Sequence, residues 1–497
     1  MKPLVLMLHP SDNVAVAPFS LPAGTDVTVD GRSISLCEAV PAGHKIALAE
    51  LSVGMQVVKY GHPIGETTKP VRRGDWVHTH NLKTSLSGVI KYQYKPTVWS
   101  GESAPTGCTF NGYLRVNGDV GTRNEVWILP TVGCVNHAAE RIVRACSEQF
   151  VGRVDGVFSF AHPYGCSQSG HDLDNTQRIL AGLMRHPNAG GVLLLGLGCE
   201  DNQIESQLEA AGEFDRSRLR YFNAQDIDDE VERGVEVVRE LVSLMEHDSR
   251  TERPVSDLIV GLECGGSDAL SGITANPLVG RVADRVVVEG GGSILSEVSE
   301  MFGAEQTLMS RAVNEDVYSN IEGLINDFKQ YFIALGRPIY ENPSPGNLEG
   351  GLTTLEEKSL GAIKKGGSAP VAEVLRYGDT KRTAGLSLLE TPGNDGVSTT
   401  GMVAAGATAI LFTTGRGTPL GSPVPTVKIS TNTSLYERKP GWIDFNAGAL
   451  ADGSAEMGAL ESGLFDLLLD VASGRTQANN ERSDYRDIAI WKTGVTH

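Results

Sequence analysis

Residues 126–136 read VWILPTVGCVN, and this stretch decides the fold class. The apolar run Val126–Leu129 is typical of a buried strand, a turn containing proline and glycine follows, and a helical stretch begins at His137. The same order of strand, turn and helix recurs after Gly156–His162 and after Val192–Gly196. Alternation of this kind predicts an α/β fold, in which a mostly parallel sheet is flanked by helices.

Working outward from this stretch, we predict two α/β lobes, residues 109–250 and 251–497, separated near the polar segment 247–256. The helices expected in the first lobe are His137–Phe150, Leu173–Arg185, Gln203–Ala211 and Asp226–Met245. The strands expected in the second lobe are Leu258–Leu262, Val286–Val288, Leu386–Leu389, Ala409–Phe412 and Val427–Ile429, with a long helix over 314–335.

For residues 1–92 we predict a small β-rich unit, and for residues 93–108 we predict a linker, because that segment lacks periodicity. The short β-branched or aromatic runs in the first unit are Val14–Val16, Val27–Val29, Ile46–Ala49, Val57–Lys59 and Trp76–His78. A chain of 497 residues has room for two to four domains, which agrees with this division.

Charge and composition exclude several classes of partner. The formal net charge of −18 disfavours nucleic acid, because phosphate binding needs basic patches. An anionic substrate would therefore need local cations or a metal. No apolar stretch reaches the roughly 20 residues that span a bilayer, and Met1–Pro10 is no signal peptide, so we expect no membrane and a cytoplasmic location. Homo-oligomers are common among large soluble enzymes, and we expect one here.

Four of the seven cysteines follow predicted strands, each next to glycine. They are Cys134, Cys166, Cys199 and Cys264. Ligands of open α/β sheets bind beyond the carboxyl ends of the strands, so the four thiols could converge on one metal site. Thiolates bind iron or zinc, singly or as a cluster. The alternative is that each cysteine is a small buried hydrophobe.

The N-terminal unit carries a second group of candidate residues, His44, Lys59, His78 and His80. His78 and His80 alternate along a predicted strand and would share one face. Two imidazoles on one face can bind a divalent metal or act as acid and base. Singly, each is more often an ordinary histidine.

Glycine-rich segments with arginine form a third group of candidates, for a substrate carboxylate. They hold Arg115, Arg123, Asn124 and Arg416, and Asn276 follows one of the cysteine turns as a hydroxyl binder. Each arginine could equally hold a structural turn. The third glycine of a dinucleotide fingerprint and a phosphate-binding loop are both missing from the sequence, so a nicotinamide oxidoreductase is disfavoured.

Several long strings, in order along the whole chain, resemble the altronate and galactarate dehydratase family. They are GHKIALAEL, KYGHPIG, NGDVGTRNEVWILPTVGCVN, HPYGCSQ, RHPNAGGVLLLGLGCEDNQ, LECGGSDALSGITANP, EMFGAEQ, ENPSPGN, GGLTTLEEKSLG, FTTGRGTP and STNT. The resemblance implies a small SAF domain joined to a two-lobed α/β body. It also implies a lyase that depends on a divalent metal, Fe2+ or Mn2+.

Within this family, the length and the wording of 59–65 and 128–136 favour D-altronate as the sugar-acid substrate and 2-keto-3-deoxy-D-gluconate, an intermediate of hexuronate breakdown, as the product. Galactarate and a sulfonated hydroxy acid such as sulfolactate are the alternatives. A non-catalytic sugar-acid binding protein is a further one.

Our hypothesis from the sequence places the metal, or an iron–sulfur cluster, among the four thiols. The histidines of the N-terminal unit would close over it, and an arginine would hold the substrate carboxylate. A single metal held by those histidines with Asp or Glu, without thiolates, is the rival arrangement.

Overall fold

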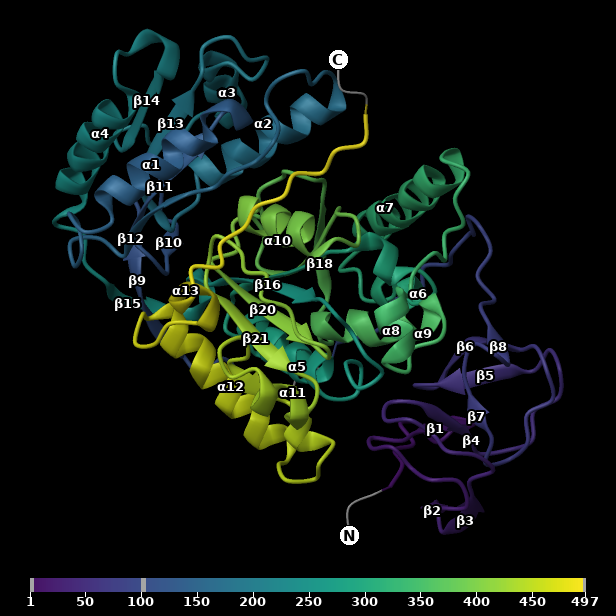
Figure 1. Ribbon diagram of the computed structural model, residues 1–497. Helices are drawn as coiled ribbons and strands as arrows, with labels where there is room; N and C mark the ends of the chain where they lie inside the picture. Colours follow the sequence, from purple (N-terminus) through teal and green to yellow (C-terminus); the bar gives the residue numbers. More distant parts are fainter. Residues whose placement is uncertain (1–3, 100–103, 495–497) are drawn as a thin grey trace.

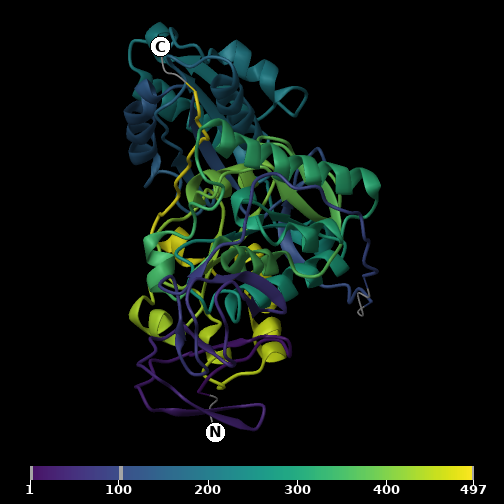
Figure 2. The ribbon, with the colours of Figure 1, turned by 90° about the vertical axis from the view of Figure 1, so that its right-hand side faces the viewer.

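The computed structural model describes residues 4–99 and 104–494, and it consists of three parts (Figure 1). The small N-terminal unit and the first lobe lie at opposite ends of the molecule, with the second lobe between them in both views (Figures 1 and 2). Antiparallel strands come first and two parallel sheets with helices follow, so the predicted fold class is confirmed.

The N-terminal unit is built from short antiparallel strands around a small apolar core. Alternation decides which side chains enter that core: in the hairpin of β2 and β3, Val27 and Ile34 are paired and buried while their chain neighbours face outward. The strands are β1 (Val14–Val16), β2 (Asp26–Val29), β3 (Arg32–Ser35), β4 (Lys45–Ala47), β5 (Gln56–Lys59), β6 (His62–Thr67), β7 (Trp76–Val77) and β8 (Leu82–Lys83).

The first lobe has a four-stranded parallel sheet in the order β12-β11-β13-β14. Alternate residues of β11 supply two different cores: Val126 and Ile128 face one, and Trp127 and Leu129 face the other. The strand is therefore buried on both faces, with α1 and α4 on one side and α2 and α3 on the other. The elements are β11 (Glu125–Pro130), β12 (Gly156–Ser159), β13 (Ala189–Gly196), β14 (Leu219–Asn223), α1 (Asn136–Cys146), α2 (His171–Met184), α3 (Ile204–Ala211) and α4 (Glu230–Met245).

The second lobe has a seven-stranded parallel sheet in the order β18-β19-β17-β16-β20-β21-β22. Its strands are β16 (Ile259–Cys264), β17 (Gly292–Leu295), β18 (Val371–Leu375), β19 (Gly385–Leu389), β20 (Ala409–Thr414), β21 (Thr426–Ser430) and β22 (Phe445–Asn446). Its helices are α5 (Ala275–Val288), α6 (Glu305–Met309), α7 (Glu315–Ala334), α8 (Pro345–Glu349), α9 (Leu355–Ala362), α10 (Asp395–Ala404), α11 (Thr433–Arg438), α12 (Met457–Ala472) and α13 (Asn479–Arg482).

A third small sheet joins the two lobes, and it consists of β9 (Thr109–Leu114), β10 (Val120–Gly121) and β15 (Thr251–Pro254). β15 follows the first lobe in the chain and pairs antiparallel with β9, which precedes it. The chain therefore enters and leaves the first lobe side by side.

Two local predictions were wrong. Val286–Val288, predicted as a strand, is the last turn of α5, because Val286 continues the buried helical face of Val279 and Val282. The strand that follows is β17, four residues later. In the N-terminal unit β7 ends at Val77, so His78 and His80 lie in a turn and do not alternate along a strand.

The two lobes pack through α2 and α10. Gly182 permits this contact, because a Cβ atom there would lie 2.5 Å from the backbone oxygen of Ala404. The C-terminal segment then runs from the second lobe to the first (Figure 1), where the backbone amides of Thr493 and Gly494 donate to the Asp172 carboxylate. No helix in the described part of the chain is long and apolar enough to cross a membrane.

Candidate active site

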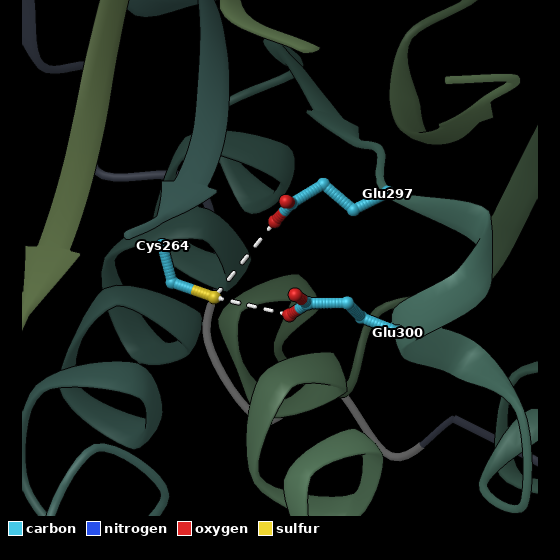
Figure 3. A group of neighbouring side chains, drawn as sticks. All are labelled: Cys264, Glu297 and Glu300. Atoms are coloured by element: carbon cyan, nitrogen blue, oxygen red, sulfur yellow. Dashed lines mark hydrogen bonds between the residues drawn. The ribbon is translucent and has the colours of Figure 1, made fainter. Parts of the chain in front are cut away.

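A buried group of one thiol and two carboxyls lies at the carboxyl edge of the second-lobe sheet (Figure 3). Cys264 is the last residue of β16, and Glu297 and Glu300 follow the neighbouring strand β17. The Cys264 sulfur lies 3.8 Å from the Glu297 carboxylate and 3.6 Å from that of Glu300. Three potential metal ligands therefore converge at one point, with their ligand atoms within 4.8 Å of one another.

Glu297 holds its place in this group with an unusual backbone. Its φ of 65° lies in the left-handed region, which costs a residue with a side chain about 1–3 kcal/mol. The Thr391 hydroxyl accepts a hydrogen bond from the Glu297 backbone amide at 2.8 Å and helps to fix this conformation. Strain of this kind is typical of a functional position, where the direction of the side chain outweighs the local cost.

A second group overlaps the first through Glu297 and adds Glu263 and Asp395. Asp395 begins α10 and can approach because residue 265 is glycine: a Cβ atom there would lie 2.0 Å from the Asp395 carboxylate. Ser398, one turn further along α10, donates a hydrogen bond to Glu263. Burial raises the pKa of Asp395 to about 7 and also raises that of Glu263.

Two buried lysines face these acids. Lys365 Nζ lies 2.7 Å from the Cys264 sulfur and 3.4 Å from Glu297, and Lys358 Nζ lies 2.7 Å from Glu300. Burial raises the pKa of the Cys264 thiol to about 11, even though Lys365 opposes the shift. Burial, followed by repulsion from the neighbouring carboxylates, raises the pKa of Glu297 well above its ordinary value.

The donor set of this region suits a divalent cation. The four carboxyls of Glu263, Glu297, Glu300 and Asp395 outnumber the two lysine ammonium groups, and carboxylates with a thiolate are ligands that Fe2+ and Mn2+ accept. Like charges at this separation in a buried site cannot all remain ionised without added positive charge. The residues present therefore fit the predicted metal, although of the four predicted thiols only Cys264 lies here.

Helix α9 joins the acidic group to the N-terminal unit. Glu357 forms ion pairs with Lys45 at 2.9 Å and with Lys59 at 2.7 Å, and all three side chains are buried. The next residue, Lys358, reaches Glu300. The predicted catalytic residue Lys59 is thus engaged in docking the N-terminal unit onto α9, and adjacent residues of that helix contact the N-terminal unit and the acidic group.

The charges in the docking contact shift the pKa values of its members in different directions. Burial lowers the pKa of Lys45 to about 8, because the attraction of Glu357 does not offset it. Burial also acts on Lys59, but there the attraction of Glu357 outweighs it and the pKa is raised. For Glu357, burial is outweighed by the two ammonium groups, which hold its carboxyl pKa below the ordinary range.

His44 and His78 lie at the edge of the same interface, in contact with Trp76. The Trp76 indole donates a hydrogen bond to His44 Nδ1 at 3.1 Å, and His44 Nε2 lies 3.2 Å from the backbone oxygen of Glu349. An indole N–H can only donate and a carbonyl oxygen can only accept. His44 is therefore held as the neutral tautomer that carries its proton on Nε2, and both ring nitrogens are occupied.

His78 differs from His44 because its Nδ1 is buried without a hydrogen-bond partner. Its ring stacks on Trp76 with centroids 5.4 Å apart and meets His44 edge-on at 4.7 Å. Burial, followed by the positive charge of Lys45, lowers the pKa of His78 to about 4. His78 is thus neutral at physiological pH with one buried ring nitrogen that has no partner. His80 is exposed, and its ring centroid lies 5.1 Å from that of Trp76.

Arg416 follows β20 and shares a contact partner, Glu349, with His44. Its guanidinium pairs with the Glu349 carboxylate at 2.9 Å, and the backbone oxygen of that same glutamate contacts His44. Asn276 is buried on α5, where it donates to Gly361 and accepts from Thr413. The structure therefore links Arg416 to His44 through one shared glutamate, while the amide of Asn276 is already satisfied within the lobe.

The other predicted substrate-binding residues lie at the amino end of β11, in structural contacts. Arg115 bonds to the Pro187 backbone oxygen and to the Asn124 side chain. Arg123 forms a two-pronged ion pair with Glu481 of α13. Carboxylate binding by Arg115, Arg123 and Asn124 stays a prediction, and in this structure the three side chains tie the first lobe to its surroundings.

The remaining predicted thiols, Cys134, Cys166 and Cys199, are exposed at the carboxyl edge of the first-lobe sheet. The N-terminal unit packs on the second lobe, at the opposite end of the molecule (Figures 1 and 2). The expected arrangement, in which the histidines close over four converging thiols, is therefore not the arrangement of this structure. The reason is that the first three strand–turn–cysteine motifs belong to the first-lobe sheet, whereas the last one, which carries Cys264, belongs to the second-lobe sheet.

Two cavities lie near these elements. A cavity of about 10 Å³, room for about one water molecule, lies between Tyr60 of the N-terminal unit, Asp268 and Lys358. A cavity of about 1280 Å³ lies between the linker and α5, and its lining includes Trp99, Asp284 and Lys364. The small cavity lies where the N-terminal unit meets α9, and its lining includes the predicted residue Asn276. The large cavity contains none of the predicted site residues.

Sequence reasoning missed most of the acidic group. Glu297 and Glu300 follow β17, and the strand predicted in that region was placed on α5 instead. The signal was available, because the short apolar run of 292–295 ends directly at polar residues, as the cysteine motifs do. Lys358 and Lys365 carried no signal, since only tertiary packing brings α9 and the residues after it to this edge.

Three families of known proteins match successive parts of the chain. The family described as Altronate/galactarate dehydratase SAF domain matches residues 3–85. D-galactarate dehydratase/Altronate hydrolase, second domain, matches residues 112–246. D-galactarate/Altronate dehydratase, C-terminal, matches residues 255–496.

Individual relatives match almost end to end. Altronate dehydratase of Escherichia coli (strain K12) is 49 % identical over 493 residues, which is 99 % of each chain. Altronate dehydratase of Bacillus subtilis (strain 168) is 47 % identical over 493 residues, again 99 % of each chain. Galactarate dehydratase (L-threo-forming) of Escherichia coli (strain K12) is 34 % identical over 498 residues, covering 96 % of this chain and 94 % of the relative.

Proposed function

Because the chain belongs to the altronate/galactarate dehydratase family, we propose that it is a hydro-lyase that removes water from D-altronate and gives 2-keto-3-deoxy-D-gluconate. The observation that carries the choice of substrate is the 49 % identity with an altronate dehydratase over 99 % of both chains, against 34 % with a galactarate dehydratase. Family membership itself confirms the resemblance found in the sequence.

The difficult step is removal of the C2 proton, because the resulting enediolate adds charge beside an existing carboxylate. A divalent metal, Fe2+ or Mn2+, bound by Cys264, Glu297 and Glu300 would supply positive charge to offset this. Lys358 and Lys365 hold Glu300 and Glu297 in position through their ion pairs. The chain thereby keeps a pre-oriented ligand set at the carboxyl edge of the sheet.

We assign proton transfer to His78. It has a buried ring nitrogen without a partner and stays neutral down to about pH 4, so it can accept a proton at physiological pH. His44 is fully hydrogen-bonded and positions Trp76, on which His78 stacks. Arg416 lies at the same edge and is the cation we assign to the substrate carboxylate, in exchange for Glu349.

We place the reaction in the cytoplasm, because all seven cysteines are free thiols, as a reducing compartment would leave them.

An anaerobic assay tests the proposed reaction. The purified chain is stripped of metal and supplied with D-altronate, and 2-keto-3-deoxy acid is followed with and without added Fe2+ or Mn2+. Galactarate and sulfolactate are run in parallel. Turnover of D-altronate that requires added metal is the expected result. Faster turnover of galactarate or sulfolactate would overturn the substrate assignment. Full activity in the presence of a chelator would overturn the proposed dependence on a metal.

The metal site is tested separately by binding. Glu300→Gln removes one carboxylate ligand, and we expect it to weaken Mn2+ binding at least tenfold, as measured by calorimetry and by metal content after dialysis. Glu461→Gln is the matched control, because Glu461 forms an ion pair with Arg281 at the surface, away from the acidic group. Equal Mn2+ affinity of the two variants would place the metal elsewhere.

A further inference from the structure

We propose that Cys134, Cys166 and Cys199 form a three-thiolate site for an iron–sulfur cluster, separate from the acidic group of the second lobe. The three cysteines follow β11, β12 and β13, which are neighbours in the order β12-β11-β13. All three thiols are exposed and free. The proposal holds whether or not D-altronate is the substrate, because it rests on the first lobe alone.

The register of the sheet places the three thiols at one edge. Pro130 of β11 is paired with Leu195 of β13, and each is followed by a cysteine four residues later. Ile128 of β11 is paired with Ser159 of β12, whose turn carries the third cysteine. Neighbouring strands lie about 4.8 Å apart, so three turns that leave adjacent parallel strands at the same edge stay close together.

Hydrogen bonds fasten the three turns to one another. The Gly133 amide donates to the Tyr164 backbone oxygen at 2.9 Å, which joins the turns of Cys134 and Cys166. The Asn202 amide donates to the Gly165 backbone oxygen at 3.0 Å, and the Asn202 side chain donates to Thr131 at 3.0 Å. The turn of Cys199 is thereby tied to both of the others.

Glycine before the cysteines makes this close approach feasible. Gly165 has a φ of +99°, and a Cβ atom there would lie 2.1 Å from the backbone oxygen of Thr131 and 2.8 Å from the Val132 Cα. A Cβ atom at Gly133 would lie 2.9 Å from the His162 backbone oxygen. The residues directly before Cys166 and Cys134 are therefore packed against each other's turns without side chains between them.

Polar groups around the thiols suit a cluster. The Gln225 side chain donates a hydrogen bond to the Cys199 sulfur at 3.4 Å, and donors to sulfur tune cluster potentials in iron–sulfur proteins. The side-chain oxygen of Asn202, the residue that ties the turns together, is buried without a partner. This second observation marks a polar group that the fold leaves available at the same edge.

A cluster and a single metal ion differ in how closely they hold their thiolates. Thiolates on one zinc ion lie about 4 Å apart, since Zn–S bonds are about 2.3 Å and tetrahedral. Within residues 4–99 and 104–494, no group of three ligand atoms within 4.8 Å of one another includes these cysteines. A cluster of several irons holds its thiolates farther apart, and three thiolates leave one iron of a four-iron cluster for another ligand.

The test is iron and sulfide analysis of the full chain, produced and purified anaerobically. We expect several irons and a matching amount of acid-labile sulfide per chain, with visible charge-transfer absorbance. Cys134→Ser, Cys166→Ser and Cys199→Ser should each lose most of the sulfide. Cys37→Ser is the matched control, because Cys37 is also exposed but lies in the N-terminal unit. This variant should keep all of its labile sulfide.

Any of three results would overturn the proposal. They are a wild-type chain without labile sulfide, a wild-type chain that holds zinc at these thiols, and serine variants that keep their sulfide. Serine at an exposed position preserves the fold, which circular dichroism verifies. Glu300→Gln separates this site from the one in the second lobe, because it should lose Mn2+ and keep its sulfide.

Discussion

The ring centroids of His44 and His78 lie 4.7 Å apart, yet the two imidazoles differ in their hydrogen bonds. Trp76 donates to His44 Nδ1, and the Glu349 backbone oxygen takes the other nitrogen. His78 receives neither contact, and its buried Nδ1 has no hydrogen-bond partner. Hydrogen bonds thus fix the ring of His44, whereas His78 keeps a ring nitrogen that is available for proton transfer.

Replacing His78 with asparagine should lower kcat by about 10²–10⁴-fold, the usual contribution of a general acid or base. The ring stack on Trp76 is lost at the same time, so a circular dichroism spectrum should accompany the kinetics. His247→Asn is the control, because His247 is exposed after α4, and it should keep full activity. A His78→Asn enzyme with unchanged kcat would show that proton transfer belongs to another group.

The pKa of His78 also sets a pH dependence. Its value of about 4 in the folded chain is below the ordinary value of 6.5, because burial disfavours the charged ring. The neutral form should persist to about pH 4, so kcat/KM should lose His78-dependent activity only below that pH. The unfolded chain takes up the proton nearer pH 6.5, so the stability tied to this group is complete above pH 6.5 and is lost as the pH falls towards 4. An acidic limb near pH 6.5 in the wild-type profile, absent in His78→Asn, would contradict this.

At the scale of elements, α9 connects two parts of the molecule that are far apart in sequence. Three consecutive glutamate and lysine side chains on it contact four partners: Glu356 bonds to Thr84, Glu357 to Lys45 and Lys59, and Lys358 to Glu300. The helix is buried along its whole length, which explains its lack of an amphipathic pattern. One helix therefore both docks the N-terminal unit and contacts the acidic group.

Glu357→Gln should destabilise the chain by about 3–5 kcal/mol, because it leaves two buried lysines with no compensating charge. Urea unfolding measures the change. Glu461→Gln serves as the control, because its partly exposed pair with Arg281 should contribute less than about 1 kcal/mol. The contribution of Glu357 should be present above its unfolded pKa near 4.3 and be lost only as the pH falls through its lower folded value. Similar midpoints for both variants would mean that the ion pairs do not hold the N-terminal unit.

At the scale of the whole molecule, the two lobes share one hydrophobic core that includes residues of both sheets, such as Trp127 and Phe412. The α2–α10 contact closes that core at Gly182, and the C-terminal segment crosses the junction to reach Asp172 (Figure 1). The N-terminal unit, by contrast, is attached through the linker and the buried ion pairs of α9. The lobes should therefore unfold together.

Gly182→Ala tests the contact between the lobes. Helix propensity alone would favour alanine by up to about 1 kcal/mol, but the added Cβ lies 2.5 Å from the Ala404 oxygen, so we expect a net loss of about 1–3 kcal/mol. Gly323→Ala in α7 is the matched control, because a Cβ there meets nothing within 4 Å. The thermal midpoint should fall for the first variant and rise for the second, and a rise in both would mean that the lobes tolerate a wider separation.

The sequence by itself determined the α/β class, the β-rich N-terminal unit and most elements of both lobes, since a strand buried on both faces appears as a continuous apolar run such as Val126–Leu129. Family membership was also readable from the strings alone. Only the tertiary structure decided which motifs meet. Cys264 resembles Cys134 in its local sequence, but its strand belongs to another sheet, where it faces Glu297 and Glu300. Residues separated by tens of positions converge through strand order and helix packing, and no local pattern encodes that order.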